Sequence, residues 1–109
     1  MNKQRAAIAV LLFKLETELR ELQLWQNQPP SKEALASTQP FCLDTLELHQ
    51  WLQFVFIKRI SQLLDSGGAL PNRCDITPYA EEYWPSSDSS FESLLSCLRQ
   101  LDAAFVDNG

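Results

Sequence analysis

The residues of this chain that could do chemistry are few and scattered. His49 is the only histidine, and no serine or cysteine accompanies it at the spacing of a recognised catalytic motif. A catalytic histidine needs a nucleophile or a carboxylate partner in such an arrangement. The sequence therefore predicts a protein without catalytic activity, in which His49 is a hydrogen-bonded residue at the edge of the core.

The three cysteines, Cys42, Cys74 and Cys97, do not form the pattern of a disulfide framework or a metal site. Disulfide frameworks use even numbers of cysteines, and zinc sites use closely spaced pairs such as Cys-x-x-Cys. We therefore expect reduced thiols that act as small apolar fillers. This usage favours a cytoplasmic protein with no metal and no other cofactor.

Arg59 and Asp102 are charged residues within apolar helical stripes. A helical wheel places Arg59 on the same side as Leu52 and Ile60, and Asp102 precedes Phe105 in the last apolar stripe. Because a buried charge is costly unless it is paired, we predict an Arg59–Asp102 ion pair that joins two helices. The alternative is that Arg59 lines a pocket for a small anionic ligand.

Trp51, Phe54 and Lys58 form the candidate interaction surface. The same wheel places them on the outer face of their helix, among polar side chains. Exposed tryptophans commonly anchor protein interfaces, so this face is predicted to bind a partner protein or a second copy of the chain. The alternative is that the connection over residues 28–40, or the short helix near residues 78–84, covers both aromatic rings.

Composition limits the remaining classes of function. The chain has 109 residues, of which 45% are hydrophobic, as expected for a single domain spanning residues 1–109. Its formal net charge is −5 and its nine basic residues are scattered, which disfavours direct binding to nucleic acid or to anionic membranes. The apolar run over residues 6–13 is too short to span a bilayer, so we interpret it as part of a helix.

Hydrophobic spacing predicts an all-α protein. Helices are expected near residues 3–25, 45–66, 78–84 and 90–106, with no β-sheet. The second helix is predicted to begin at an Asp44 cap, with Glu47 three residues later, and to end at Gly67. Three long helices and one short helix, each long one with an apolar face, predict a small antiparallel up-and-down bundle.

Three segments of the chain resemble the YqcC-like family of small bacterial proteins. They are STQPFCLDTLELHQWLQFVFIKRI (Ser37–Ile60), TPYAEEY (Thr77–Tyr83) and LRQLDAAF (Leu98–Phe105). The most specific part of the resemblance is Trp51-Leu52-Gln53 with Ile57 and Arg59. It implies an up-and-down helical bundle and adds no activity. The chain departs from the family pattern at Lys58, where proline is often expected, and this predicts a straighter second helix.

The sequence thus predicts a small cytoplasmic helical-bundle protein that binds another protein without catalysis. The alternative is an accessory factor of tRNA modification, because the resembling family is often named alongside tRNA pseudouridine synthase C through gene proximity. That alternative follows from the resemblance alone. The sequence identifies neither the partner nor the oligomeric state.

Overall fold

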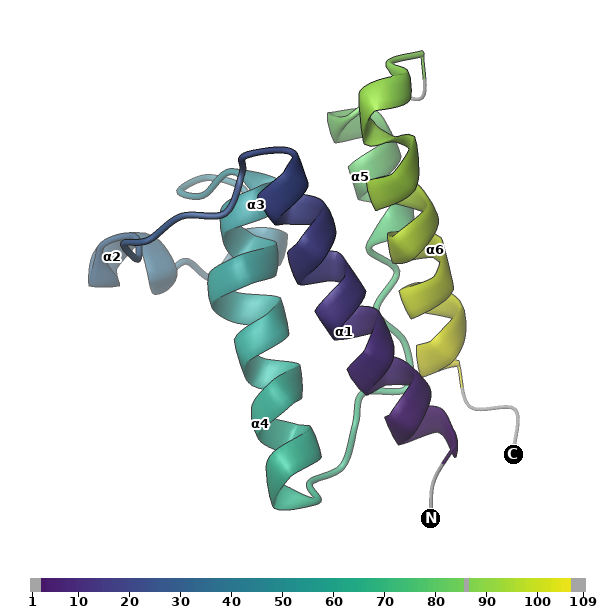
Figure 1. Ribbon diagram of the computed structural model, residues 1–109. Helices are drawn as coiled ribbons and strands as arrows, with labels where there is room; N and C mark the ends of the chain where they lie inside the picture. Colours follow the sequence, from purple (N-terminus) through teal and green to yellow (C-terminus); the bar gives the residue numbers. More distant parts are fainter. Residues whose placement is uncertain (1–2, 86, 107–109) are drawn as a thin grey trace.

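The computed structural model describes residues 3–85 and 87–106, and this part of the chain contains helices and no strand (Figure 1). The long helical elements are α1 (Lys3–Glu21), α6 (Glu92–Phe105) and a continuous run of α3 (Leu48–Trp51), the π-helical turn η2 (Leu52–Ile57) and α4 (Lys58–Ser66). The short elements are α2 (Lys32–Leu35), α5 (Thr77–Tyr83) and the 3₁₀ turns η1 (Pro40–Cys42) and η3 (Ser89–Phe91). The predicted all-α class is confirmed.

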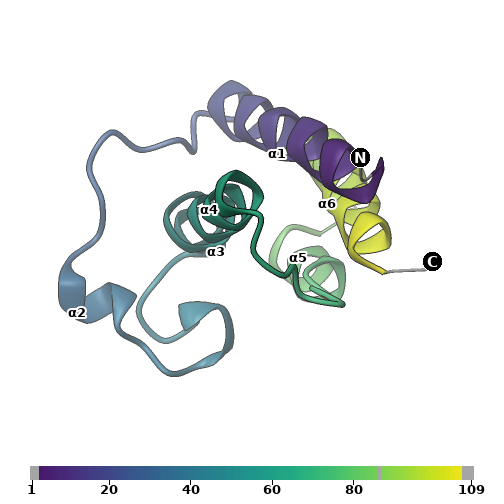
Figure 2. The same cartoon turned by 90° about the horizontal axis from the view of Figure 1, so that it is seen from below.

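The helices pack around one core. Helix α1 lies against α6, which runs in the opposite direction, and α4 lies on the other flank of α1 (Figure 1). Viewed along the helices, α5 occupies the space beside α6 and α4, facing α1 across the interior (Figure 2). The largest side chains with essentially no exposure are Ile8, Leu15, Leu19, Leu48, Leu52, Ile60, Ile76, Leu94, Leu95, Leu98, Leu101 and Phe105. They come from every long helix, so the core depends on all of them.

Helix α1 ends earlier than the sequence predicts. It ends at Glu21 rather than near residue 25, because Gln23 adopts a left-handed conformation with φ 62°. The Leu24 backbone amide donates to the Leu19 carbonyl at 2.9 Å, and the Gln23 backbone amide donates to the Arg20 carbonyl at 3.0 Å. These two bonds form a Schellman motif, which satisfies the last carbonyls and turns the chain away. Gly67, with φ 74°, ends α4 as predicted.

The next long helical run begins later than predicted, at Leu48 rather than near residue 45. Asp44 does not cap it, and its carboxylate instead accepts a hydrogen bond from the Ser37 hydroxyl. The cap is formed instead at Glu47, whose amide donates to the Gln50 side-chain oxygen at 2.8 Å. Residues 43–45 form a turn after η1, and Cys42 at the end of η1 is buried.

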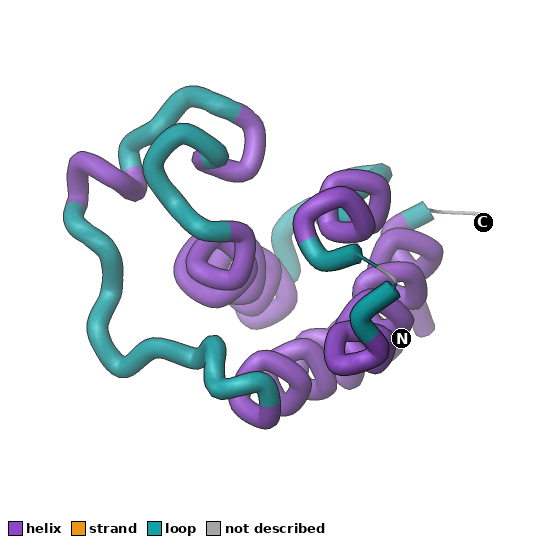
Figure 3. The backbone as a smooth tube through the Cα atoms, turned by 90° about the horizontal axis from the view of Figure 1, so that it is seen from above, coloured by secondary structure: helices purple, strands orange, loops and turns teal. Residues whose placement is uncertain are grey.

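Residues 22–47, here called the arm, leave the bundle and return to it, with α2 at the outermost point (Figure 3). The buried side chain of Gln53, in the π-helical turn, holds the first part of the arm. Its amide oxygen accepts from the Gln26 amide at 2.9 Å, and its nitrogen donates to the Gln26 carbonyl at 2.7 Å. The side chains of Gln50 and Gln26 are also joined, at 3.1 Å. One π-helical residue therefore fixes where the arm departs.

Candidate functional site

The π-helical turn determines which side chains of its helix face the core. Leu48, Leu52, Phe56 and Ile60 are all buried, at a constant spacing of four residues. In a straight α-helix each step of four residues rotates the side chain by about 40°, so these four positions would spread over about 120° of the helix surface. The i→i+5 bonding of a π-helix includes one more residue per turn and absorbs this rotation. The helix is thus continuous through Lys58 but not uniform.

This shift places Arg59 at the surface, where a straight wheel would have placed it in the core. The structure does not bring Arg59 and Asp102 together, and Arg59 forms no ion pair with any residue that the structure describes. The predicted ion pair is therefore wrong. The error is that of a wheel drawn at one constant angle through a helix whose period changes within it.

Asp102 has a different role from the predicted one. Its carboxylate accepts hydrogen bonds from the Ile76 amide at 3.0 Å and from the Thr77 amide at 2.7 Å. Both amides lie at the start of α5, where a helix has unpaired N–H groups and a favourable site for negative charge. Asp102 thus caps α5 from α6, and these bonds explain how a carboxylate is tolerated within an apolar stripe.

The predicted interaction surface is only partly open. Trp51 and Phe54 are half-buried, and Lys58 is exposed. The ring of Phe41, from η1, packs edge-on against Trp51 with centroids 4.9 Å apart, and its other contact is a stack on Tyr79 at 5.0 Å. The end of the arm and α5 thus cover one side of Trp51, as the alternative interpretation expected, while leaving part of its surface accessible.

A cleft of about 290 Å³ opens beside this aromatic cluster, between the π-helical turn, η1 and the loop before α5. Its lining is mostly apolar and comes from Pro40, Phe41, Trp51, Val55, Phe56, Ile60, Pro71 and Cys74, with Arg59 and Arg73. A second, more open hollow lies on the other side of Arg59 and is lined by Leu35, Phe54, Val55, Lys58, Arg59 and Gln62. Arg59 and Val55 belong to both, so the two hollows form one continuous surface.

The charge at this cleft is the opposite of the charge of the whole chain, which is −5. Arg73 forms an exposed ion pair with Asp75, with 3.0 Å between the nitrogen and the carboxylate oxygen. Arg59 has no ion-pair or hydrogen-bond partner within residues 3–85 and 87–106. Since exposed ion pairs are weak, both guanidinium groups are available to a carboxylate or phosphate.

The backbone around the cleft is strained. Phe41 and Cys42 have φ values of 57° and 50°, in the left-handed region that side chains other than glycine rarely adopt. Such conformations cost free energy and persist only where surrounding contacts hold them. They cluster at functional sites, as do π-helical turns, and here both occur on one cleft. Together with the free arginine, they identify this cleft as the candidate functional site.

The cysteine thiols give this site no nucleophile. Burial raises the pKa of Cys74, at the cleft, to about 12, and the Asp102 and Asp75 carboxylates act in the same direction. Burial likewise raises the pKa of Cys97 to about 11. Both thiols are therefore neutral near pH 7, and only a thiolate is a strong nucleophile. Across residues 3–85 and 87–106 there is also no group of histidine, cysteine and acidic side chains that could hold a metal ion.

None of the described helices has the length and apolar character needed to cross a membrane.

His49 is not among the residues that line the cleft, and it contacts Leu24, which follows the end of α1. Burial lowers its pKa below the usual value, against the opposing effects of the Glu47 carboxylate and a hydrogen bond to the Leu24 carbonyl. Its Nδ1 atom is buried and has no partner among the described residues. The imidazole is half-buried and is hydrogen-bonded to the Leu24 carbonyl.

His49 gives the protein an acid-sensitive contribution to stability. Because its folded-state pKa is below the unfolded value of about 6.5, the unfolded chain takes up the proton first as the pH falls. The contribution is thus complete above that value and is lost progressively as the pH falls toward the folded pKa. Urea melts at pH 7.5 and pH 5.5 should show a larger loss of stability for the wild type than for His49→Gln. Equal losses in the two proteins would contradict the assigned direction.

Sequence reasoning missed three residues of this region: Phe41, Gln53 and Arg73. Pro40 restricts the backbone of the residue before it, which indicated a turn close to Phe41. It did not indicate that Phe41 itself adopts a left-handed conformation. Gln53 interrupts an otherwise apolar stretch, and a polar residue there could have been recognised as one that needs a buried partner. Nothing local indicates that Arg73 lies near Arg59.

Comparison with known proteins places this geometry in context. Residues 7–104 match the model of the DUF446 family, which is described as tRNA pseudouridine synthase C. The uncharacterized protein YqcC of Escherichia coli K12 is 39% identical over 101 residues, which cover 93% of each chain. The solution NMR structure of YqcC from E. coli superposes with a TM-score of 0.85 at 36% identity, covering 99% of this chain and 92% of that one.

A further relative is a protein of Pectobacterium carotovorum subsp. carotovorum that carries the name tRNA pseudouridine synthase C. It is 53% identical over 60 residues, which make up 55% of this chain but only 16% of that protein. Most of that relative thus lies outside the matching segment.

Proposed function

We propose that this chain, which belongs to the DUF446 family described as tRNA pseudouridine synthase C, is a non-catalytic module that binds a segment of a partner protein. The scaffold of the proposal is a small up-and-down bundle in the cytoplasm, with α1, α3–α4 and α6 as its long helices. The observation that carries the proposal is the cleft at the π-helical turn, which combines aromatic walls with a free arginine.

The dimensions of the cleft favour a protein partner over a small metabolite. Its volume of about 290 Å³ lies at the lower limit for pockets that enclose small molecules, which run from roughly 300 to 1,000 Å³. It suits one or two side chains of a partner, inserted as interface anchors usually are. The adjoining hollow beside Phe54 and Leu35 extends the surface along the same helix and could hold the flanking residues.

The chemistry of the lining defines the segment that it would bind. An aliphatic or aromatic side chain would pack against Trp51 and Val55, which are half-buried now and would lose water on binding. A carboxylate close to that side chain would pair with Arg59, whose planar guanidinium can hold both oxygens. The expected partner segment therefore has a large apolar residue beside an acidic one.

Within residues 3–85 and 87–106, the groups at the cleft favour a binding role over an enzymatic one. The thiols of Cys74 and Cys97 are neutral near pH 7, and His49 does not line the cleft and is bonded to Leu24. Arginine by itself can bind and orient an anion, but it supplies neither a nucleophile nor a base.

A second candidate is an accessory role in tRNA modification. It is favoured by the P. carotovorum protein, in which a segment similar to this chain is part of a polypeptide named tRNA pseudouridine synthase C. Covalent attachment gives two linked modules a high effective concentration, which favours contact between them. In this version, the partner that inserts a segment into the cleft is the synthase itself.

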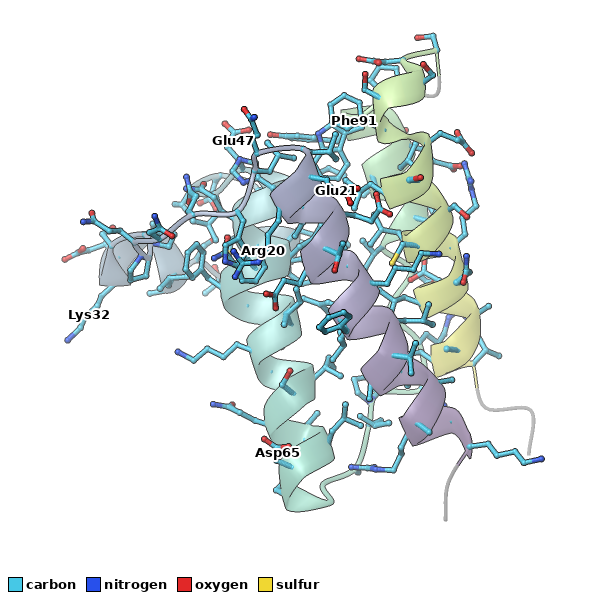
Figure 4. All side chains as sticks on the ribbon, viewed as in Figure 1. Arg20, Glu21, Lys32, Glu47, Asp65 and Phe91 are labelled. Carbon is cyan, nitrogen blue, oxygen red and sulfur yellow. The ribbon has the colours of Figure 1, made fainter. Side chains whose placement is uncertain are left out.

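Affinity capture from cells of the source organism tests the proposal. Tagged wild type, Arg59→Glu and Lys32→Glu are compared, since the last carries the same charge reversal on an α2 side chain that points away from the bundle (Figure 4). Arg59→Glu should weaken partner binding by about tenfold or more, because it places like charges in contact. Lys32→Glu should match the wild type.

One result would contradict the proposed function, and a separate measurement tests the second candidate. Equal recovery of the partner with Arg59→Glu and Lys32→Glu would remove the cleft as its binding site. The tRNA version is tested separately with purified tRNA pseudouridine synthase C from the same organism. Failure of that enzyme to bind would remove the second candidate and leave the first in place.

A further inference from the structure

Helix α1 carries a second apolar stripe on the side that faces away from the core. Among the described residues, Val10 and Phe13 are the most exposed of the large hydrophobic side chains, at 68% and 74%. With Ala6 and Thr17 they follow the helical repeat on the face opposite the buried Ile8 and Leu15 side. Clustered exposed apolar residues on a small protein commonly mark a contact surface.

A groove runs beside this stripe, between α1 and α4, with a volume of about 310 Å³. Its lining is Ala9, Leu12, Phe13, Glu16, Ile57, Ser61, Leu64 and Asp65. Ala9, a small side chain of the lining, directly precedes Val10 in the sequence. A protruding aromatic ring and an apolar groove therefore lie side by side on one face, which allows two identical faces to fit each other.

We propose that α1 pairs in antiparallel orientation with α1 of a second copy of this chain, forming a two-fold symmetric dimer. In a two-fold contact each residue pair occurs twice. The Phe13 ring of each copy can therefore pack at the groove of the other copy. The register that places Val10 against Phe13 of the second copy also brings that phenylalanine to Ala9, at the mouth of the groove. This face is separate from Trp51 and Phe54, so the dimer leaves the cleft accessible.

Charge complementarity selects a second copy in this orientation. The same register, which is symmetric about residues 11 and 12, brings Lys3 within one position of Glu21 of the second copy. At 100° per residue these two side chains lie on the same flank of α1, whereas Arg20, which is paired with Glu16, points to the other flank. Both side chains are exposed, and neither forms an ion pair with another residue in the described part of the chain. A parallel pairing would instead set Lys3 against Lys3 and Glu21 against Glu21.

Sedimentation equilibrium over a wide concentration range tests the dimer. The wild type should show a monomer–dimer equilibrium. Phe13→Ser should raise the dissociation constant by about tenfold or more, because a buried phenylalanine side chain contributes strongly to association. Leu43→Ser is the matched control, since Leu43 is 50% exposed but lies in the arm. It should leave the constant unchanged. A wild type that stays monomeric, or a dimer unaffected by Phe13→Ser, would overturn the proposal.

Charge reversal tests the orientation without depending on the stability of either variant. Lys3→Glu and Glu21→Lys should each weaken the dimer by about two- to fivefold, the size expected for exposed ion pairs. An equimolar mixture of the two variants should regain wild-type affinity, because both contacts in the mixed dimer are then between opposite charges. A mixture no tighter than either variant alone would overturn the antiparallel register.

Discussion

Replacing Asp102 with alanine is expected to lower the free energy of unfolding by about 3 kcal/mol. The change removes both hydrogen bonds to the start of α5, at 3.0 Å and 2.7 Å, and leaves the amides of Ile76 and Thr77 without an acceptor. Both residues are buried, so water cannot readily replace the carboxylate. Bonds to a charged acceptor are stronger than neutral ones, and the donors left behind pay their full desolvation cost.

Urea melts of Asp102→Ala and Asp102→Asn provide the measurement. The asparagine keeps one acceptor oxygen and should fall between the alanine variant and the wild type. Arg59→Met is the companion variant and should change stability by no more than about 0.5 kcal/mol, as exposed positions usually do. A loss in Arg59→Met as large as that in Asp102→Ala would contradict the assignment and restore the Arg59–Asp102 pair.

Replacing Gln53 with leucine is expected to cost about 2 kcal/mol and to loosen the arm. The two side chains are similar in size, so the main change is the loss of both bonds to the Gln26 backbone. The Gln26 backbone N–H and C=O groups would then lack partners, and this favours conformations in which water solvates this part of the arm. Gln62→Leu is the matched control, because Gln62 is exposed on α4.

The readouts are a urea melt and limited proteolysis. Gln53→Leu should be cleaved faster within residues 22–47 than the wild type, while Gln62→Leu should be cleaved at the wild-type rate. Unchanged cleavage of the arm in Gln53→Leu would show that Gln53 does not anchor it.

Those features of the fold that repeat along the chain could be predicted from the sequence. The buried face of α1 repeats at the α-helical spacing, and Ile8, Leu15 and Leu19 on it are fully buried. Gly67 ends α4 because only glycine takes a left-handed conformation without cost. In both cases the physical cause is local, so it is visible in the order of the residues.

The π-helical turn could not be predicted, because no residue of Leu52–Ile57 requires i→i+5 bonding. Its cause is tertiary: core positions spaced by four must share a face, and Gln53 must reach Gln26. This one turn changes the orientation of everything after it. It accounts for the wrong placement of Arg59 and hence for the wrong ion pair.

The charge of Asp102 was recognised as a problem for the core, but its solution was not. The sequence shows that a carboxylate needs a partner there, and an oppositely charged side chain is the simplest partner to search for. The actual partners are backbone amides of Ile76 and Thr77, which every residue possesses and which no pattern of side chains reveals.

The candidate cleft was only partly foreseen. Trp51 and Arg59 were singled out for separate reasons, as an exposed anchor and a buried charge, and they prove to line one cleft. Phe41 and Arg73 reach it from segments on either side in the chain, so their proximity depends on the folded arm and the loop before α5. Sites assembled from distant segments require the tertiary structure.

The claim that the cleft receives a partner segment is tested most directly by crosslinking from within it. A benzophenone side chain is placed at position 71, in the cleft lining, and in a separate protein at position 106, an exposed position at the end of α6. After irradiation in the source organism, the crosslinked peptide is identified by mass spectrometry. We expect a crosslink from position 71 alone, to a segment with a large apolar residue beside an acidic one, and its loss in Arg59→Glu. A crosslink that persists in Arg59→Glu, or that forms equally from position 106, would contradict the account.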